Sequence, residues 1–216
     1  MLSADFGRLF DEAVRVEKAG ADALHLDIMD GHFVPNLSFG TNIVSTSKKA
    51  VKIPLDVHLM LSNPDRYVDR FMDAGADWVS IHIEADCDVA ATLKTIRDHK
   101  VLAGLVLKPK TPAEALAPYL GQFDYVLCMT VEPGYGGQSF MSDMLPKIRA
   151  VAELSRKTAK PFPVMVDGGI NNDTGALCAA AGATQLVSGS TLFKAPDLAE
   201  AIAGMREKAE KACEQA

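Results

Sequence analysis

A short signal recurs along this chain at spacings that are multiples of about 27 residues. Ala-Gly-Ala occurs at residues 19–21, 74–76 and 181–183, each time after an amphipathic stretch and before a short apolar run. Glycine suits the left-handed position just past the end of a helix, so each copy predicts a helix stop followed by a strand. The three glycines lie 55 and 107 residues apart, close to two and four units. Eight such units account for all 216 residues.

Short apolar runs alternate with helix-like stretches throughout this frame. The expected strands cover residues 23–27, 55–58, 78–83, 102–107, 125–129, 163–166 and 185–187. One intervening helix is expected to start with Asn63 as its cap and Pro64 as its first residue, and to stop at Gly75. The alternation predicts a parallel sheet, and eight units predict an α/β fold of the (β/α)8 TIM barrel type, one domain spanning residues 1–216. A doubly wound open sheet is the alternative, but the GxGxxG turn expected after its first strand is absent.

The beginning of the chain departs from this scheme. A helix is expected to start near Asp5, so only Met1, Leu2 and Ser3 remain where the first strand of the barrel should lie. The expected barrel therefore has seven complete strands, with the first strand largely missing. Such a gap would leave two unpaired strand edges, which proteins usually avoid.

Charge and cysteine content exclude several classes of protein. The net charge of −6 argues against a surface that binds nucleic acid or acidic membranes, although a few local donors would still hold a small anionic substrate. The four cysteines show no CxxC spacing, so neither a disulfide framework nor a zinc knuckle is expected. No signal peptide and no apolar run of about 20 residues is visible. We expect a cytoplasmic protein.

Histidines and aspartates gather at the ends of three expected strands, where barrels of this kind carry their functional residues. His25 and Asp27 are two residues apart on one strand and share a face, as Asp56 and His58 do on the next, and Asp167 ends a third. Two imidazoles and two carboxylates suit one divalent cation such as Zn²⁺, Fe²⁺, Mn²⁺ or Co²⁺. The alternative is a set of buried, hydrogen-bonded polar residues, but four of them would be costly to bury without a partner. Asp56 is expected to support His58.

Other residues near the strand ends admit two interpretations each. Met29, Met60 and Met129 are ordinary core filler one at a time, yet together they would form an apolar wall beside the metal. His82 points to the inside of its strand and is expected to support the site or to pack in the core. Lys108 follows a strand, where either a Schiff-base or phosphate-binding lysine or a solvated lysine would fit.

Three glycine-containing loops follow the last three expected strands. They are EPGYGGQ at residues 132–138, Gly168-Gly169 and Gly189-Ser190. Glycines let backbone N–H groups face an anion, and the loops after the last two strands are the usual phosphate site of this fold. One such pair could be only a tight turn, whereas three in adjacent loops predict a phosphate site.

These stretches together closely resemble the ribulose-phosphate 3-epimerase family. The matching segments are HLDIMDGHFVPN at 25–36, DVHLM at 56–60, MTVEPGYGGQ at 129–138, VDGG at 166–169 and GS at 189–190. They are long, they occur in the family's order, and they extend over nearly the whole chain.

The resemblance implies a metal-dependent epimerase that interconverts D-ribulose 5-phosphate and D-xylulose 5-phosphate through an enediolate. It implies that one divalent cation is held by His25, Asp27, His58 and Asp167, and that Asp27 and Asp167 are also the catalytic acid–base pair. A small phosphorylated ketose is the implied substrate, and a homo-oligomer is expected. The implied substrate contacts are His58, Gly134, Tyr135, Gly136, Gly137, Asp167, Gly168, Gly169, Gly189 and Ser190.

Elementary chemistry supports the roles that the resemblance implies. Epimerisation beside a ketone requires a proton to leave one face of the carbon and another to arrive on the opposite face, which two carboxylates can do. A cation at the carbonyl and hydroxyl oxygens stabilises the developing negative charge.

The resemblance also sharpens the question of the missing strand. The family opens with a strand ending Pro-Ser-X-Leu, whose serine contacts substrate, and the match here begins just after that serine. Ser3 corresponds to a later position and is not expected to take the role. Either the gene start is set too far downstream, or this form lacks the strand, which would make it less stable and a weaker enzyme.

Three alternatives stay open. A hexulose-phosphate 3-epimerase acting on D-allulose 6-phosphate would share the metal site, although residues 136–140 and 167–169 look more like the pentose form. A barrel lyase would be a Schiff-base aldolase using Lys108, or a phosphosugar aldolase or decarboxylase, but no D-x-K-x-x-D motif is present and paired histidines are. The last is a truncated barrel that only binds a metal or a partner.

Overall fold

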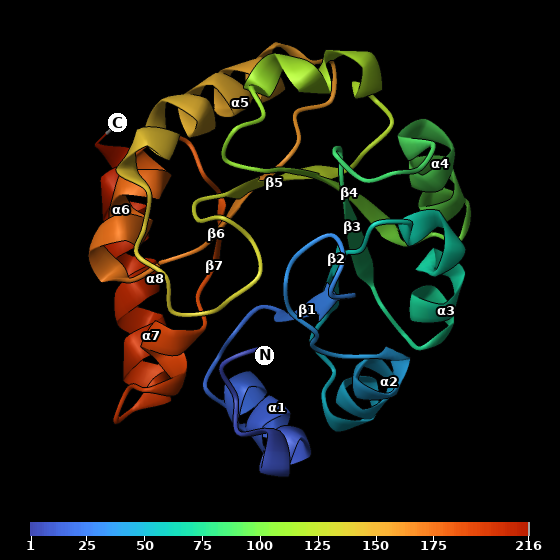
Figure 1. The fold of residues 1–216 in the computed structure, drawn as a ribbon. Helices are drawn as coiled ribbons and strands as arrows, with labels where there is room; N and C mark the ends of the chain where they lie inside the picture. Colours follow the sequence, from blue (N-terminus) through green and yellow to red (C-terminus); the bar gives the residue numbers. More distant parts are fainter. Residues whose placement is uncertain (216) are drawn as a thin grey trace.

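The computed structural model describes residues 1–215 and shows one curled parallel sheet with helices on its outer face (Figure 1). The strands are hydrogen-bonded in chain order from first to last, and every neighbouring pair is parallel. They are β1 (Leu24–Met29), β2 (Leu55–Met60), β3 (Trp78–His82), β4 (Leu102–Leu107), β5 (Tyr125–Met129), β6 (Val164–Asp167) and β7 (Gln185–Val187).

Helices follow the strands in alternation. They are α1 (Leu9–Lys18), α2 (Thr41–Ala50), α3 (Val68–Asp73), α4 (Val89–Asp98), α5 (Leu145–Lys157), α6 (Asn172–Ala180), α7 (Ser190–Phe193) and α8 (Leu198–Glu214). The segment between β4 and β5 is a 3-10 helix, Ala113–Tyr119, which contains Pro118 and therefore lacks one backbone N–H. Shorter 3-10 turns cover Phe6–Arg8, Pro64–Arg66 and Ser142–Met144.

The recurring Ala-Gly-Ala signal marks helix ends as predicted. Its glycines follow α1, α3 and α6, and Gly20, Gly75 and Gly182 have φ values of 89°, 107° and 103°. These backbone conformations are open to glycine and strained for other residues. All seven expected strands are confirmed, with boundaries within two residues of the prediction.

The expectation at Asn63 is only partly confirmed. Pro64 does begin a helical turn, but that turn is 3-10 and α3 starts later, at Val68. Asn63 makes no capping bond, because its amide donates instead to the carbonyl of Asp86, at 2.7 Å.

The sheet ends on β1 and β7, so the predicted TIM-barrel class with a missing first strand is confirmed. The N-terminal segment lies beside β1 in the gap, with α1 outside it (Figure 1). Its ammonium group donates to the carbonyl of His25, at 2.7 Å, and the Met1 side chain is buried. We call this gap between β7 and β1 the seam.

Alternate residues of each strand face opposite sides of the sheet. On β1, Leu24, Leu26 and Ile28 join the core between sheet and helices, while His25 and Asp27 take the inner face. Complete burial of one large apolar side chain contributes about 1.5–3 kcal/mol, so this outer core is the main support of the sheet. Among residues 1–215, no helix has the length and apolar character needed to cross a membrane.

Candidate active site

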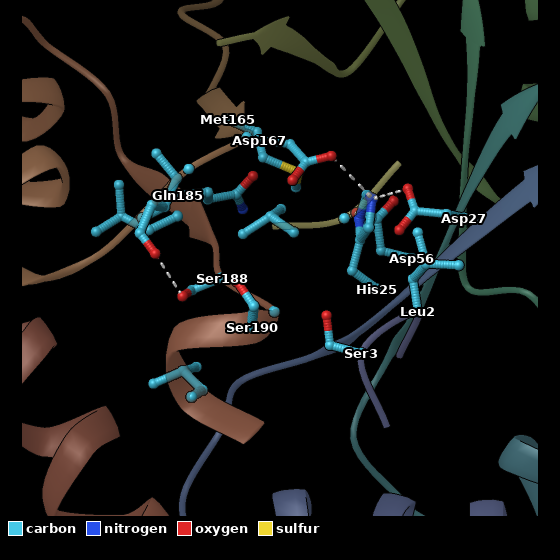
Figure 2. A pocket seen from close by; sticks show the side chains of 18 of the residues that line it. Leu2, Ser3, His25, Asp27, Asp56, Met165, Asp167, Gln185, Ser188 and Ser190 are labelled. Carbon is cyan, nitrogen blue, oxygen red and sulfur yellow. Dashed lines mark hydrogen bonds and ion pairs between the residues drawn. The ribbon is translucent and has the colours of Figure 1, made fainter. Parts of the chain in front are cut away.

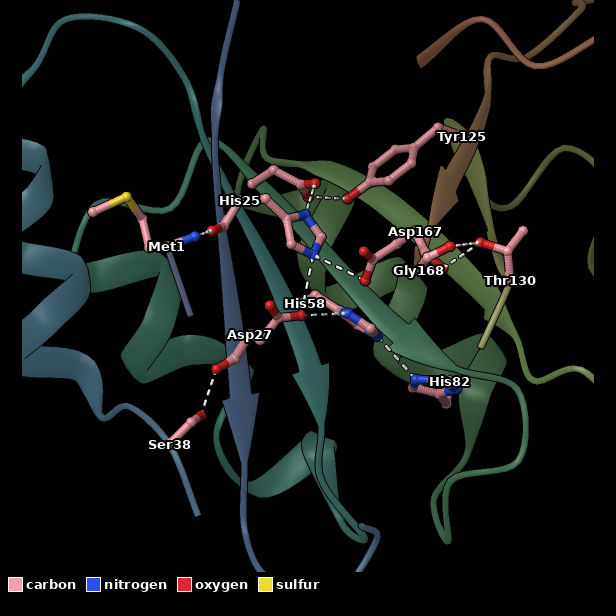
Figure 3. Close-up of polar contacts among 11 residues, drawn as sticks. Met1, His25, Asp27, Ser38, His58, His82, Tyr125, Thr130, Asp167 and Gly168 are labelled. Carbon is pink, nitrogen blue, oxygen red and sulfur yellow. Dashed lines mark hydrogen bonds and ion pairs between the residues drawn. The ribbon is translucent and has the colours of Figure 1, made fainter. Parts of the chain in front are cut away.

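Four side chains that the sequence singled out meet inside the sheet. His25 and Asp27 come from β1, His58 from β2 and Asp167 from the end of β6. One nitrogen or oxygen atom from each lies within 4.8 Å of the others. The alternation of the strands turns all four inward, so their convergence follows directly from the sheet (Figure 3).

The ring of His25 is held from one side and free on the other. Its Nδ1 lies 2.7 Å from Oδ2 of Asp56, whose other oxygen accepts a hydrogen bond from the Tyr125 hydroxyl, also at 2.7 Å. Its Nε2 is buried without a hydrogen-bond partner, 3.3 Å from Asp27 and 3.9 Å from Asp167 (Figure 2). Asp56 therefore orients His25, whereas the sequence had suggested that it supports His58.

The unpartnered Nε2 of His25 shows whether the residues of this cluster fit a metal ion. Buried polar atoms nearly always have a partner, so an orphaned imidazole nitrogen beside two carboxylates indicates a position meant for a cation. Two nitrogen and two oxygen donors form a suitable ligand set for a divalent ion. The residues present fit such an ion.

His58 is completely buried and contacts two groups. Its Nδ1 lies 3.2 Å from Oδ1 of Asp27, and its Nε2 lies 2.9 Å from Nε2 of His82. His82 in turn places its Nδ1 3.2 Å from Glu84. Burial lowers the pKa of His82 to about 4, so this ring is neutral near pH 7.

The two aspartates of the cluster titrate in opposite directions. Burial, together with the negative charge of Asp27, raises the pKa of Asp167 to about 6. Burial also acts to raise the pKa of Asp27, but His25 and His58 outweigh it and hold that pKa well below its usual value. Burial acts to lower the pKa of His25, but the charges of Asp27 and Asp56 outweigh it and raise that pKa well above 6.5. One carboxylate is thus ionised while the other can carry a proton near neutral pH.

A cavity of about 740 Å³ opens beside the cluster. Volumes of this size accommodate small-molecule ligands. His25, Asp27 and Asp167 line it, and so do Met29, Met60 and Met129, all three of which are buried. His58 has no exposed surface and does not line the cavity.

The glycine-containing loops line the same cavity. The residues expected at the phosphate end all do so: Gly134, Tyr135, Gly136, Gly137, Gly168, Gly169, Gly189 and Ser190. At Gly169 the backbone has φ 65°, and a Cβ would lie 2.5 Å from the backbone nitrogen of Phe140. Only glycine allows this close approach of two loops.

Several residues that shape the site were not found in the sequence. Tyr125 holds Asp56 from 69 positions away, and Thr130 donates to the carbonyls of Asp167 and Gly168 where β6 ends. Ser3, which was named in the sequence analysis but given no substrate role, also lines the cavity, with its hydroxyl oxygen 3.0 Å from where a Cβ of Gly189 would lie. No local sequence pattern signals such contacts, because each depends on which strands become neighbours.

Lys108 has a different environment from the one an aldolase would need. Its ammonium nitrogen lies 3.6 Å from the centroid of the Phe33 ring, a cation–π contact, and the residue does not line the cavity. A Schiff-base role for Lys108 therefore finds no support in its position.

Comparison with solved structures shows which known folds are similar. KGPDC from Streptococcus mutans superposes with a TM-score of 0.74 at 16% identity, covering 98% of this chain and 95% of that one. A 3-hexulose-6-phosphate synthase superposes with a TM-score of 0.68 at 19% identity, covering 93% and 92%. At such low identity these similarities describe the fold alone.

Comparison with known sequences is more specific. The chain is 45% identical over 207 residues to ribulose-phosphate 3-epimerase of Bacillus subtilis (strain 168), covering 95% of each protein. It is also 45% identical over 208 residues to the enzyme of that name from Synechocystis sp., covering 95% of this chain and 90% of the relative. A model of the ribulose-phosphate 3 epimerase family matches residues 1–193. The chain therefore belongs to the ribulose-phosphate 3-epimerase family.

Proposed function

We propose that this protein interconverts D-ribulose 5-phosphate and D-xylulose 5-phosphate by moving the proton at C3. The observation that carries the proposal is the position of Asp27 and Asp167. Both are inner-face carboxyls beside the free nitrogen of His25, at one part of a cavity whose other walls are glycine loops. A sugar phosphate would suit such a cavity, with its sugar carbons beside the two carboxyl groups and its phosphate at the glycine loops.

The two carboxyl groups divide the proton transfer between them. Asp27, whose pKa is held low, is ionised and accepts the C3 proton from one face. Asp167, whose pKa is raised to about 6, donates a proton to the opposite face. In the reverse direction the roles exchange, and each positioned acid or base contributes about 10²–10⁴-fold to the rate.

His25, Asp27, His58 and Asp167 would hold the divalent cation. When bound, such a cation supplies positive charge that stabilises the oxygens of an enediolate. The three methionines on the cavity wall exclude water from the carbon that loses its proton. His58 would contribute to substrate binding only through the cation, since it does not reach the cavity.

The glycine loops would bind the phosphate. Gly168 and Gly169 follow β6, Gly189 and Ser190 follow β7 and lead into α7, and Gly134–Gly137 follow β5. Backbone N–H groups in such loops offer directional donors to phosphate oxygens without a lysine or arginine. This explains how a chain with net charge −6 can bind an anionic substrate.

The direct test is turnover of D-ribulose 5-phosphate by the purified protein. Activity should be lost after treatment with a chelator and should return when Zn²⁺, Fe²⁺, Mn²⁺ or Co²⁺ is added singly. Assay of D-allulose 6-phosphate in parallel tests the hexulose alternative. A folded, metal-loaded protein that turns over neither substrate, or that prefers the hexulose phosphate, would contradict the proposal.

We also propose that the protein acts in the cytoplasm as a homo-oligomer. None of the cysteines in the described chain is paired, which suits a reducing compartment. A related protein from rice carries the name cytoplasmic isoform and is 42% identical. Large apolar side chains are exposed at Phe6, Phe10 and Leu37, as subunit contacts would require. Sedimentation at micromolar concentration distinguishes a monomer from an oligomer.

A further inference from the structure

A chain of three side chains leads away from the proposed metal site. It runs from His58 on β2 to His82 on β3 and on to Glu84 in the loop after β3 (Figure 3 shows the two histidines). His58 and His82 have no exposed surface. Nothing in the proton transfer proposed above uses His82 or Glu84.

The hydrogen bonds of this chain have one consistent direction. Burial acts to raise the pKa of Glu84, but hydrogen bonds from His82, Thr111 and the Lys108 N–H outweigh it and lower that pKa, so Glu84 is an ionised acceptor. His82 must then donate to it through Nδ1–H. A neutral ring that donates through Nδ1 has a lone pair on Nε2, so His58 must donate to His82 through its own Nε2–H.

The consequence falls on the other nitrogen of His58. With its proton on Nε2, the ring keeps a lone pair on Nδ1, the atom that faces Asp27 and the cluster. A lone pair 3.2 Å from a carboxylate oxygen is unfavourable unless a cation lies between them, so this tautomer suits the metal-bound site, whereas without a metal Asp27 attracts the proton to Nδ1. A histidine binds a metal only through an unprotonated nitrogen. The opposite tautomer would present an N–H to the cation.

We propose that Glu84, acting through His82, fixes the tautomer of His58 and thereby makes its Nδ1 available to the metal. Both are positioning residues, and the proposal rests on the metal site proposed above. The arrangement parallels that of His25, whose Nδ1 is held directly by Asp56. In both cases a carboxylate is the terminal acceptor, but for His58 a second imidazole lies between.

The surroundings of His82 maintain this chain. The ring of Phe33 packs against His82 with centroids 4.7 Å apart, and the ammonium group of Lys108 lies over the Phe33 ring. Glu84 is fixed by its other oxygen, Oε1, which accepts from the Lys108 N–H at 2.9 Å and from the Thr111 hydroxyl. Only Oε2 is directed to His82.

Glu84→Gln tests the proposal with almost no change of shape. If Oε1 keeps its loop contacts, the new amide nitrogen faces His82 and donates to it. His82 must then carry its proton on Nε2 and donate to His58, which moves the His58 proton to Nδ1. The variant therefore reverses donor and acceptor in both hydrogen bonds, the one between residue 84 and His82 and the one between His82 and His58.

Two measurements follow. Metal affinity, determined by competition with a chromogenic chelator, should fall about 10–100-fold in Glu84→Gln, the usual effect of removing an outer hydrogen-bond partner of a ligand. The ¹⁵N shifts of His58 in the metal-free protein at pH 8 should show a larger share of the proton on Nε2 in the wild type than in the variant, because Asp27 attracts the proton to Nδ1 in both proteins and Glu84 opposes it only in the wild type. The second readout needs no metal and no substrate.

Thr111→Val is the matched control, because it removes a loop contact of Glu84 and leaves Oε2 and His82 in place. It should keep the metal affinity and the His58 tautomer of the wild type. An equal loss of metal affinity in both variants would show that Glu84 acts only through the loop. A share of the His58 proton on Nε2 that is the same in the wild type and in Glu84→Gln overturns the proposal. Wild-type protein that binds no metal contradicts the proposed function instead, while the tautomer still tests the inference.

Discussion

The sheet has two contrasting regions, the wall from β2 to β5 and the seam between β7 and β1. Every residue of β2 and β5 is buried, and both neighbours of each strand supply hydrogen bonds along its length. β7 has three residues, all partly exposed, and no strand lies beyond it among the described residues. Groups that must not move, such as His58 and Tyr125, come from the wall.

At the seam, a charged group makes the hydrogen bond that a neighbouring strand would make in the wall. Along the free edge of β1, the ammonium group of Met1 donates to the carbonyl of His25. Burial lowers the pKa of this ammonium even though Asp27 and Asp167 oppose the shift, so the contact is made at the cost of desolvating a charge. The site therefore lies across both regions, with proposed ligands from β1 at an edge and from β2 and β6 inside the sheet.

The largest effect should come from the carboxylate on that edge. Asp27→Asn removes both an acid–base group and a proposed ligand, so we expect turnover of D-ribulose 5-phosphate to fall by about 10⁴-fold, the upper end for such groups. Asp167→Asn should approach the same loss. Circular dichroism should show both folded, and Asp73→Asn, at the exposed end of α3, should retain full activity. Near-normal exchange of the C3 proton with solvent in both site variants would rule out the acid–base pair.

Cysteine labelling compares the two regions directly. Burial raises the pKa of Cys128 on β5, and likewise that of Cys178 on α6, from 9.0 to about 12, so their thiolates are about 10³-fold rarer than usual at pH 8 and appear only as the pH approaches 12. Cys213 is exposed and lines the cavity near the seam. A disulfide reagent at pH 8 should modify Cys213 at least about 10³-fold faster, with sites assigned by mass spectrometry. Comparable rates at Cys128 would mean that the wall opens as readily as the seam.

The sequence predicted the wall better than the details of the site. The helix stops at glycines such as Gly20 and the positions of the strands follow from local signals, so the sequence identified the strand ends and the four side chains that meet there. The role of Asp56 was assigned to the wrong histidine, because the pairing of β1 with β2 places Asp56 opposite His25, and no local sequence signal gives that register. The contact between Tyr125 and Asp56 spans 69 residues and has no sequence pattern.

Tyr125→Phe measures how much the wall contributes to the site. The variant leaves Asp56 with one hydrogen bond fewer in a buried position, which should cost about 2 kcal/mol in the free energy of unfolding. Because Asp56 orients His25, metal affinity should also fall about tenfold. Urea denaturation and chelator competition measure the two effects. Tyr67→Phe, at an exposed position, should change stability by less than about 0.5 kcal/mol, and an equal effect there would remove the special role of Tyr125.

Filling the seam should have the smallest effect. An extension of about eight residues ahead of Met1, with alternating apolar side chains, can pair with the free edges of β1 and β7. Its backbone N–H groups would replace the ammonium of Met1 at the carbonyl of His25, and its apolar side chains would cover the cavity wall near Leu24 and Leu186. Ordering each added residue costs about 1–2 kcal/mol of entropy, which offsets most of the gain from burial.

We therefore expect a net stabilisation of about 1 kcal/mol, which raises the thermal midpoint by about 2–4 °C in a chain of this size. A glycine–serine extension of equal length is the matched control. It also displaces the Met1 ammonium from His25 but supplies no apolar side chains, so its midpoint should lie at or below that of the unextended protein. If both extensions have the same thermal midpoint, apolar side chains in the seam contribute no stability and the expected gain is wrong. If only the apolar extension stabilises the protein and also raises turnover, the open edge of β1 limits how firmly His25 and Asp27 are held.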